Sequence, residues 1–346
     1  MSLVSYSDYK CSLIGDVLEK AKKELKEDPN TRIIEVKNLR TRLEKVPELG
    51  ALRGDLKIPK FPNTRIIEVK NLRTRLEKVP GLQPRTDIKF LLPFLRARKF
   101  DQERAFQLVK NYYEVRKEQP DMFDDLKPSR VKHVIEAGIY EVLKGRNNQG
   151  CRVIVMRPGK WDPDRFPITD LPKASFLILS KIIMEDEETQ VNGIHMINNL
   201  AGATMKQASH IGPSIAKKFL HLVQDVIPLR LKRFDYVNEP TFFDIVFAIF
   251  KQFQKEKFTK RIVLNGDKFD KLHESINPEL LPTDLGGKQE PYANKEWVQE
   301  FLASDGLFSE DNKFGFLNMN LQKNKDDKKA DSTLQGLGGT FKKLEI

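Results

Sequence analysis

The spacing of apolar residues divides the chain into a helical first third and a later part where strands and helices alternate. Residues 12–27 carry apolar side chains at helical intervals and stop before Pro29, which predicts a first helix. Further helices are predicted over residues 87–98 and 101–117, the second with Asp101 as its N-cap. Because no strand pattern competes there, residues 1–120 are expected to form an all-helical domain.

One segment of the helical region occurs twice. PNTRIIEVKNLRTRLEKVP runs over residues 29–47 and again over residues 62–80, and each copy predicts an amphipathic helix. Two units are too few to bury the continuous core of a solenoid. Letter-identical copies favour a recent duplication or a sequence-assembly artefact over an old structural array. One copy is therefore expected to be surplus to the fold.

After residue 121 the period changes, and short β-rich runs alternate with helical segments. Strands separated by helices of this length pair in parallel, so we expect an α/β fold with a mainly parallel sheet. Beyond Trp297 the periodicity is lost, and residues 323–346 are typical of a flexible tail. The predicted elements are strands at 152–156, 193–198, 234–238 and 261–265, and helices at 169–186, 205–224 and 241–253.

Composition points to an intracellular protein with an anionic partner. The formal net charge is +11 over 346 residues, which suits nucleic acid or an anionic membrane surface. Cys11 and Cys151 lie far apart, so neither a disulfide framework nor a zinc site is predicted, as in a reducing compartment. No apolar run reaches the roughly eighteen residues of a membrane span, and no secretory signal is predicted. We expect a soluble, cytoplasmic protein.

The motifs of common α/β enzymes do not occur in the sequence. There is no GxxxxGK[ST], no GxGxxG after a strand and no GxSxG, and the five histidines form no metal-binding pair. No nucleophile can be paired with a base. Nucleic-acid binding rests on net charge alone, because no RNP-like or C₂H₂ pattern supports it. We therefore predict no enzyme activity, no metal site and no cofactor.

The helix predicted within TFFDIVFAIFKQF is apolar around nearly its whole circumference. A cluster of lysines and an arginine follows it, of the kind that binds lipid headgroups or phosphates. One interpretation is a buried core helix before a solvated basic turn. The other is a helix whose inner face closes an apolar cavity while its outer face meets a membrane. It is too short to span a bilayer, so it would lie in the interface.

Six segments of the chain, in this order, resemble the CRAL-TRIO lipid-transfer family: FLLPFLRARKFDQERAFQLVKNYYEVRKE, WDPDRFPITD, EDEETQVNGI, KQASHIGPSIAKK, FDYVNEPTFFDIVFAIFKQFQKEKFTKRI and HESINPELLPTDLGG. The resemblance runs from about Asp87 to Trp297. It implies a helical domain over residues 1–120, then a lipid-binding domain over 121–300 whose sheet floors a hydrophobic pocket under a movable gate helix. Residues 301–346 would form a C-terminal extension.

The resemblance also assigns residues to three sites. The gate helix falls on residues 239–253, with Phe242, Phe243, Val246, Phe247, Ile249 and Phe250. The ligand pocket falls on Phe176, Ser180, Ile194, Met196, Phe219, Leu222, Val223, Ile227, Leu229, Leu231 and Phe234, of which Ser180 is the one hydroxyl. The phosphoinositide-binding patch falls on Arg96, Arg230, Lys232, Lys257 and Arg261.

The family implies a carrier that moves one hydrophobic molecule, tocopherol-like or a phospholipid, between membranes. Phosphoinositides would assist docking, and the protein would associate transiently with endosomal or other anionic membranes. The alternative is a phosphoinositide-responsive interaction protein that binds a lipid without transferring it. The chain departs from the family pattern at several positions, among them Pro93, Gln252 and Asn265. The pair Asn198 and Asn199 is polar where relatives often have an apolar or aromatic residue, and Asn198 could hydrogen-bond a headgroup that tocopherol lacks.

Overall fold

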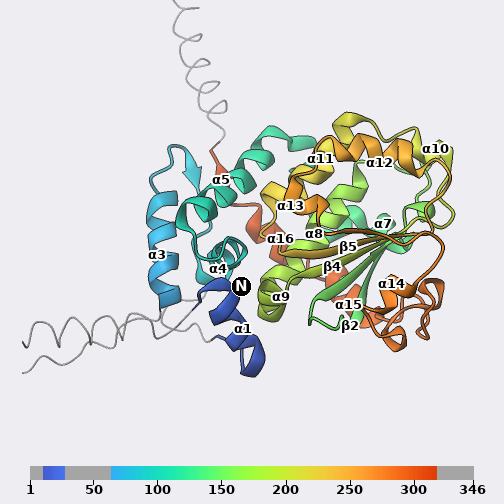
Figure 1. Ribbon diagram of the computed structural model, residues 1–346. Helices are drawn as coiled ribbons and strands as arrows, with labels where there is room; N and C mark the ends of the chain where they lie inside the picture. The colour runs from blue at the N-terminus through green and yellow to red at the C-terminus, as the bar shows by residue number, and fades with distance from the viewer. Residues whose placement is uncertain (1–10, 28–63, 318–346) are drawn as a thin grey trace, which may run out of the picture.

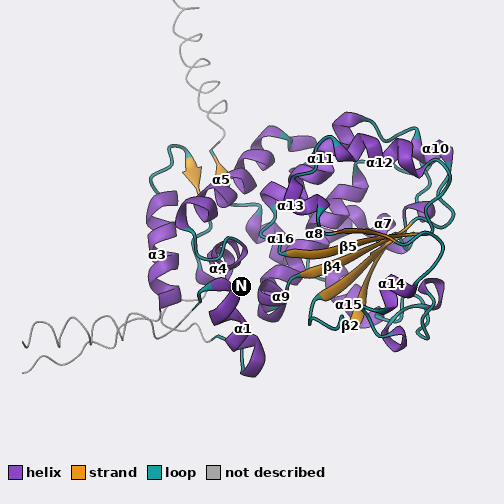
Figure 2. Cartoon of the chain, in the orientation of Figure 1, coloured by secondary structure: helices purple, strands orange, loops and turns teal. Residues whose placement is uncertain are grey.

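The computed structural model describes residues 11–27 and 64–317 of the chain. A five-stranded sheet in the order β2-β3-β4-β5-β6 lies at one side of the molecule, next to a group of helices (Figure 1, Figure 2). Strands β3 to β6 are parallel, and β2 is antiparallel to β3. The α/β fold with a mainly parallel sheet is therefore confirmed. The strands are β2 Tyr140–Arg146, β3 Arg152–Met156, β4 Ile194–Asn199, β5 Leu231–Val237 and β6 Ile262–Leu264.

The sequence pattern predicts four of these strands but not β2. The residues of β2, YEVLKGR, include Lys144 and Gly145, which are weak strand formers. The strand is stabilised by its neighbour, because β2 and β3 form a hairpin. In the connecting turn, the Asn147 Oδ1 atom accepts hydrogen bonds from the N–H groups of Gln149 at 3.0 Å and Cys151 at 2.8 Å.

Both faces of the sheet are buried. Along β3, Ile154 packs in the larger hydrophobic core, whereas Val153 and Val155 pack in a smaller core on the opposite face. This alternation follows from the two-residue period of a strand. The larger core continues without a break from the sheet into the N-terminal helices. It is this face of the sheet that carries the candidate site.

The helical region follows the sequence pattern closely. Side chains of Asp87 and Asp101 cap α4 and α5, accepting hydrogen bonds from the N–H groups of Phe90 and Arg104, so the predicted N-cap is confirmed. Aromatic rings of α4 and α5 interlock at edge-to-face angles in the core between them. The helices of this region are α1 Gly15–Leu25, α3 Thr64–Leu76, α4 Ile88–Ala97, α5 Gln102–Glu118, α6 Pro120–Phe123 and α7 Lys132–Glu136.

The second copy of the duplicated segment contributes helix α3. The centre of its apolar stripe packs in the core, because Val69, Leu72 and Leu76 are completely buried against α4 and α5. This copy is therefore part of the fold. The first copy, at residues 29–47, lies outside the described residues.

The helix predicted over residues 205–224 is interrupted. A break before Pro213 divides it into two helices, and Gly212 is the N-cap of the second. Pro213 occupies the first position of that helix, where a backbone N–H would have no hydrogen-bond partner within the helix. A π-helical turn, Leu222–Val226, follows. The remaining helices of the sheet region are α8 Asp170–Glu185, α9 Glu187–Asn192, α10 Met205–Ala208, α11 Pro213–His221, α12 Phe243–Lys251, α13 Glu256–Thr259 and α14 Asp270–His273.

Regular structure continues beyond Trp297, although the sequence there has no clear hydrophobic period. Helices α15 Lys295–Leu302 and α16 Asp305–Asp311 follow, and β7 Gly315–Phe316 pairs antiparallel with β1 Leu82–Gln83 of the helical region. Within α16, Asp311 is 2% exposed and accepts hydrogen bonds from the Tyr112 hydroxyl at 2.6 Å and from Arg116 at 2.9 Å. These elements are too short to give a clear period. The predicted tail at residues 323–346 lies outside the described residues.

Asp311→Ala is expected to destabilise the protein by about 3 kcal/mol, because it leaves the largely buried Arg116 guanidinium and the buried Tyr112 hydroxyl without their carboxylate. Equilibrium urea unfolding measures the change. The matched control is Glu310→Ala on the same helix, which removes an exposed carboxylate paired with Lys313 and is expected to cost less than about 1 kcal/mol. Equal losses in the two variants would contradict this account of the C-terminal segment.

Candidate functional site

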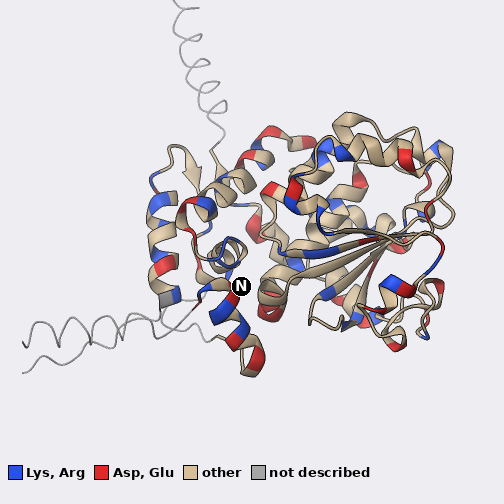
Figure 3. Ribbon diagram, in the orientation of Figure 1, with Lys and Arg blue, Asp and Glu red and all other residues tan. Residues whose placement is uncertain are grey.

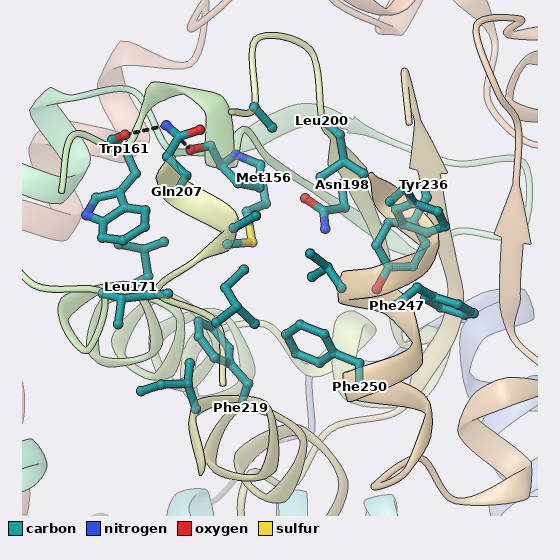
Figure 4. A pocket seen from close by; sticks show the side chains of 18 of the residues that line it. Met156, Trp161, Leu171, Asn198, Leu200, Gln207, Phe219, Tyr236, Phe247 and Phe250 are labelled. Atoms are coloured by element: carbon teal, nitrogen blue, oxygen red, sulfur yellow. Dashed lines mark hydrogen bonds between the residues drawn. The ribbon is translucent and has the colours of Figure 1, made fainter. Parts of the chain in front are cut away.

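A cavity of about 160 Å³ lies between the sheet and the helices that cover it. Strands β4 and β5 form its floor, α8 forms one wall, and α10, α11 and α12 close the remaining sides (Figure 4). Its walls are overwhelmingly aliphatic and aromatic. None of the described residues that line it carries a charge. Such a cavity accepts an apolar molecule and disfavours an ionised group, which would lose its hydration without gaining a partner.

Helix α12 presents apolar side chains on two opposite sides. On the inner side, Phe243 and Phe247 stack on each other and pack edge-on against Tyr236 of the floor. On the outer side, Ile245 is 66% exposed. Between Asp244 and Lys251 the helix has no charged residue, and Figure 3 shows this stretch uncoloured by charge. The helix is therefore no buried core helix, since Phe243 alone among its residues is buried.

The residues assigned to the gate helix lie at this helix, and most of them face the cavity. Phe242, Phe243, Val246, Phe247 and Phe250 line it, and Ile249 does not. Helix α12 ends at Lys251 with Gln252 as its C-cap.

The residues assigned to the pocket separate into two groups. Met196, Phe219, Val223 and Phe234 line the cavity. The others do not line it; they are buried elsewhere in the protein and comprise Phe176, Ser180, Ile194, Leu222, Ile227, Leu229 and Leu231. Phe176 stacks on Tyr112 at a ring distance of 5.8 Å, on the side of the helical region. The assigned residues that do line the cavity are thus one each from β4, β5, α11 and the π-helical turn after α11.

The difference on α8 is one of helical phase. Leu171 and Ser175, four residues apart, lie on one face of the helix and line the cavity. Phe176 and Ser180, also four residues apart, lie on the neighbouring face, do not line the cavity and are buried. The cavity-facing hydroxyl of α8 therefore belongs to Ser175. On the strands, the sequence could have predicted two more lining residues. The two-residue period of a strand that brings Met196 and Phe234 to the cavity also brings Asn198 and Tyr236 there. Trp161 and Gln207, which lie outside strands, gave no such signal.

A basic groove lies beside the cavity, and the two share the side chains of Val223 and Phe258. Its cations come from the end of α4, from α5, from β5 and from the segment after α12. Burial, and then repulsion by Arg261 and neighbouring cations, lowers the pKa of Lys257. Burial and Arg230 likewise lower the pKa of Arg261. The basic side chains that line the groove are Arg98, Lys99, Arg104, Arg230, Lys232, Lys255, Lys257 and Arg261.

Two of these cations already have a carboxylate partner in α1. Glu24 accepts hydrogen bonds from Arg230 at 2.8 Å and Lys232 at 3.0 Å. Burial raises the pKa of Glu24, but these two hydrogen bonds outweigh it and leave the pKa below its usual range. The N-terminal helix therefore contributes a negative charge to the edge of the groove.

The structure brings together four of the five residues assigned to the phosphoinositide patch and separates Arg96 from them. Arg96 is completely buried, donates hydrogen bonds to both Glu27 oxygens at 2.8 and 3.0 Å and contacts Gln190 at 2.6 Å. A headgroup at the surface cannot reach it. Arg96 instead links α4 to the segment after α1 and to α9. The sequence alone could not distinguish this buried arginine from the surface cations, because the carboxylate that pairs with it lies far away in the chain.

Within the described ranges, no helix combines the length and the apolar character needed to cross a bilayer.

The chain thus forms an α/β domain whose sheet is the floor of an uncharged cavity. Comparison with known proteins identifies its family. Residues 136–287 match the sequence model of the CRAL/TRIO domain. The chain is 38% identical over 300 residues to alpha-tocopherol transfer protein-like of Homo sapiens, covering 87% of this chain and 78% of that protein. The chain belongs to the CRAL/TRIO family.

Two further relatives are less similar to the chain than this protein. Clavesin-1 of Rattus norvegicus is 31% identical over 314 residues, with 90% of this chain and 79% of that protein covered. Clavesin-2 of Rattus norvegicus is 31% identical over 318 residues, with 91% and 86% covered. Among solved structures, one titled "Crystal structure of Sfh5" is 16% identical with a TM-score of 0.40, over 70% of this chain and 98% of that chain. This last similarity is too low to add to the assignment.

Proposed function

We propose that this protein binds one hydrophobic molecule in the cavity and transfers it between membranes without chemical change. The observation that carries the proposal is the uncharged cavity closed by a helix that is apolar both inside, at Phe243 and Phe247, and outside, at Ile245. The inner face would hold the ligand and the outer face would contact the bilayer. The name of the Homo sapiens relative, alpha-tocopherol transfer protein-like, supports a tocopherol-like cargo. A phospholipid is the other candidate.

The energetics favour a carrier that loads and unloads at membranes. At roughly 0.8 kcal/mol per buried CH₂, a chain of about sixteen carbons is stabilised by on the order of 10 kcal/mol relative to water. Escape through water is therefore slow. An apolar cavity and a bilayer interior are nearly equal solvents for such a chain, so small docking energies decide the direction of exchange.

We further propose that the basic groove docks the protein on anionic membranes, with phosphoinositides as the preferred headgroups. The groove adjoins the cavity through Val223 and Phe258, so a docked headgroup would lie next to the gate helix. Each cation near an anionic surface contributes about 1 kcal/mol. The protein would then work in the cytoplasm and associate transiently with endosomal or other anionic membranes.

The test of the cargo is mass spectrometry of the full chain purified without detergent, in the native state and after solvent extraction. One hydrophobic molecule per protein is expected, followed by transfer of that molecule from donor to acceptor vesicles. Binding without transfer would replace the carrier by the lipid-sensing interaction protein. An empty protein that also fails to take up tocopherol or phosphatidylinositol from vesicles would contradict the proposed function.

Lys257→Ala combined with Arg261→Ala is expected to slow transfer to vesicles containing phosphatidylinositol bisphosphate by about tenfold or more, since two docking charges are lost. Transfer to neutral phosphatidylcholine vesicles should be unchanged. The control with the same net charge is Lys288→Ala combined with Lys313→Ala, two exposed lysines that do not line the groove. Equal losses in both double variants would assign the effect to net charge, and an unchanged rate would remove the groove from the mechanism.

Ile245→Glu is expected to slow transfer to all vesicles while leaving the affinity for the bound lipid within about twofold, because the substitution charges only the outer side of α12. The control is Ile14→Glu, which places the same charge at an apolar residue that is 79% exposed beside α1. Transfer rates and equilibrium binding are measured on the same preparations. If both variants transfer as fast as the wild-type protein, the outer face of α12 does not contact the membrane.

A further inference from the structure

Two polar side chains lie next to each other in the floor of the otherwise apolar cavity. Asn198 of β4 and Tyr236 of β5 are paired residues in the parallel register, so their side chains leave the sheet on the same face. Both line the cavity. Figure 4 shows the Asn198 amide directed into the cavity beside the Tyr236 ring, with the apolar side chains of Leu171 and Phe219 on the far side.

The other polar side chains around the cavity are already engaged with the protein. The Gln207 Nε2 atom donates to the carbonyl oxygens of Pro158 and Trp161, and its Oε1 atom accepts from the Thr204 N–H at 2.8 Å. Thr204 in turn caps α10. The Tyr140 hydroxyl donates to the Leu171 carbonyl at 3.0 Å and is hydrogen-bonded to Ser175. These groups hold the walls in place and are not needed to explain ligand binding.

Asn198 is different, because its Oδ1 atom is buried and has no hydrogen-bond partner among the described residues. A buried acceptor left unmatched costs about 1–3 kcal/mol. Its neighbour Tyr236 is buried, and this burial raises the pKa of the phenol, although a hydrogen bond with Asn198 opposes the rise. Tyr236 therefore keeps its proton at neutral pH. The pair offers an acceptor, Asn198 Oδ1, next to a phenolic O–H group.

We propose that Asn198 and Tyr236 form the headgroup site of the cavity and select a neutral lipid that carries a hydroxyl group. This inference rests on the proposed function and names the class of cargo. A hydroxyl donates to Asn198 Oδ1 and accepts from the Tyr236 O–H, so both protein groups are satisfied at once. The apolar part of the lipid then extends towards Leu171 and Phe219.

The same site discriminates against the other common lipid classes. A carboxylate or phosphate meets no cation, because the described lining of the cavity has no charged side chain. A hydrocarbon or an ether without a donor leaves Asn198 Oδ1 unmatched. The basic groove is on the surface and would contact membrane headgroups, so it does not supply the missing cation inside the cavity.

The inference is tested with two matched pairs of probes, α-tocopherol with its methyl ether and 1-hexadecanol with its methyl ether. Hexadecanoic acid is added as the charged probe. Binding to the full chain is measured by equilibrium partition from phosphatidylcholine vesicles. We expect the wild-type protein to favour each alcohol over its ether by about tenfold, as the loss of one matched hydrogen bond requires. Hexadecanoic acid should bind more weakly than hexadecanol.

Asn198→Leu, which keeps the side-chain size, is expected to bring the alcohol-to-ether ratio to within about twofold of unity, and Tyr236→Phe to lower it by about threefold. Comparing the ratio between variants cancels differences between the lipids in the vesicle. Retained binding of the ethers shows that each variant is folded. The control is Ser175→Ala, which removes the hydroxyl across the cavity and should leave the ratio unchanged.

The outcomes separate the two proposals. If the wild-type protein binds alcohols and ethers equally, or if Asn198→Leu keeps the wild-type ratio, the headgroup site is wrong while lipid carriage stands. If no alcohol or ether from either pair enters the protein, the carrier itself fails. A ratio that changes only in Ser175→Ala would move the headgroup site to α8.

Discussion

An uncharged cavity has to be closed by elements whose inner sides are apolar, and among the helices that close this one, α12 also has an exposed apolar outer side. The floor is fixed by β4 and β5, which are central strands, and the wall by α8, which is buried over most of its length. Helix α12 is packed on the floor through the rings of Phe243, Phe247 and Tyr236. Its opposite side leaves Ile245 in water. Aromatic contacts on the inner side of α12 thus stabilise the closed position of the helix, whereas the exposed apolar residue on its outer side makes that position less favourable in water.

The position of the basic groove follows from the same architecture. Val223 and Phe258 have one side on the cavity and the other on the groove, so the two sites share a wall. Cations gathered there repel one another, as the lowered pKa of Lys257 indicates after the effect of burial. Glu24 of α1 offsets part of this repulsion at Arg230 and Lys232. An anionic headgroup would offset more of it, since a phosphate carries greater charge than one carboxylate.

Much of this arrangement could be predicted from residue patterns, and the failures share one cause. Helices near residues 87–98 and 101–117, the strand at 152–156 and the all-round apolar helix are local features, and the structure has them. The cavity lining on α8 depends on the phase of the helix relative to the sheet, and a shift of one position moves the assignment from the face of Leu171 and Ser175 to the face of Phe176 and Ser180. Arg96 looked like its surface counterparts because its partner, Glu27, lies far away in the chain. Long-range contacts decide such cases.

Transfer between membranes requires that the closed state be stable in water yet easily opened at a bilayer. The ligand's own apolar chain does not provide that distinction, because cavity and bilayer solvate it almost equally well. In the proposed mechanism the outer face of α12 provides that distinction, because burial of the exposed Ile245 in the membrane interface would favour movement of the helix away from the sheet only where lipid is present. A headgroup bound by Asn198 and Tyr236 adds a cost of opening that the interface must match with hydrogen bonds of its own. In the proposed mechanism, the membrane rather than the ligand therefore controls the gate, and the polar pair sets which ligands remain bound until the gate opens.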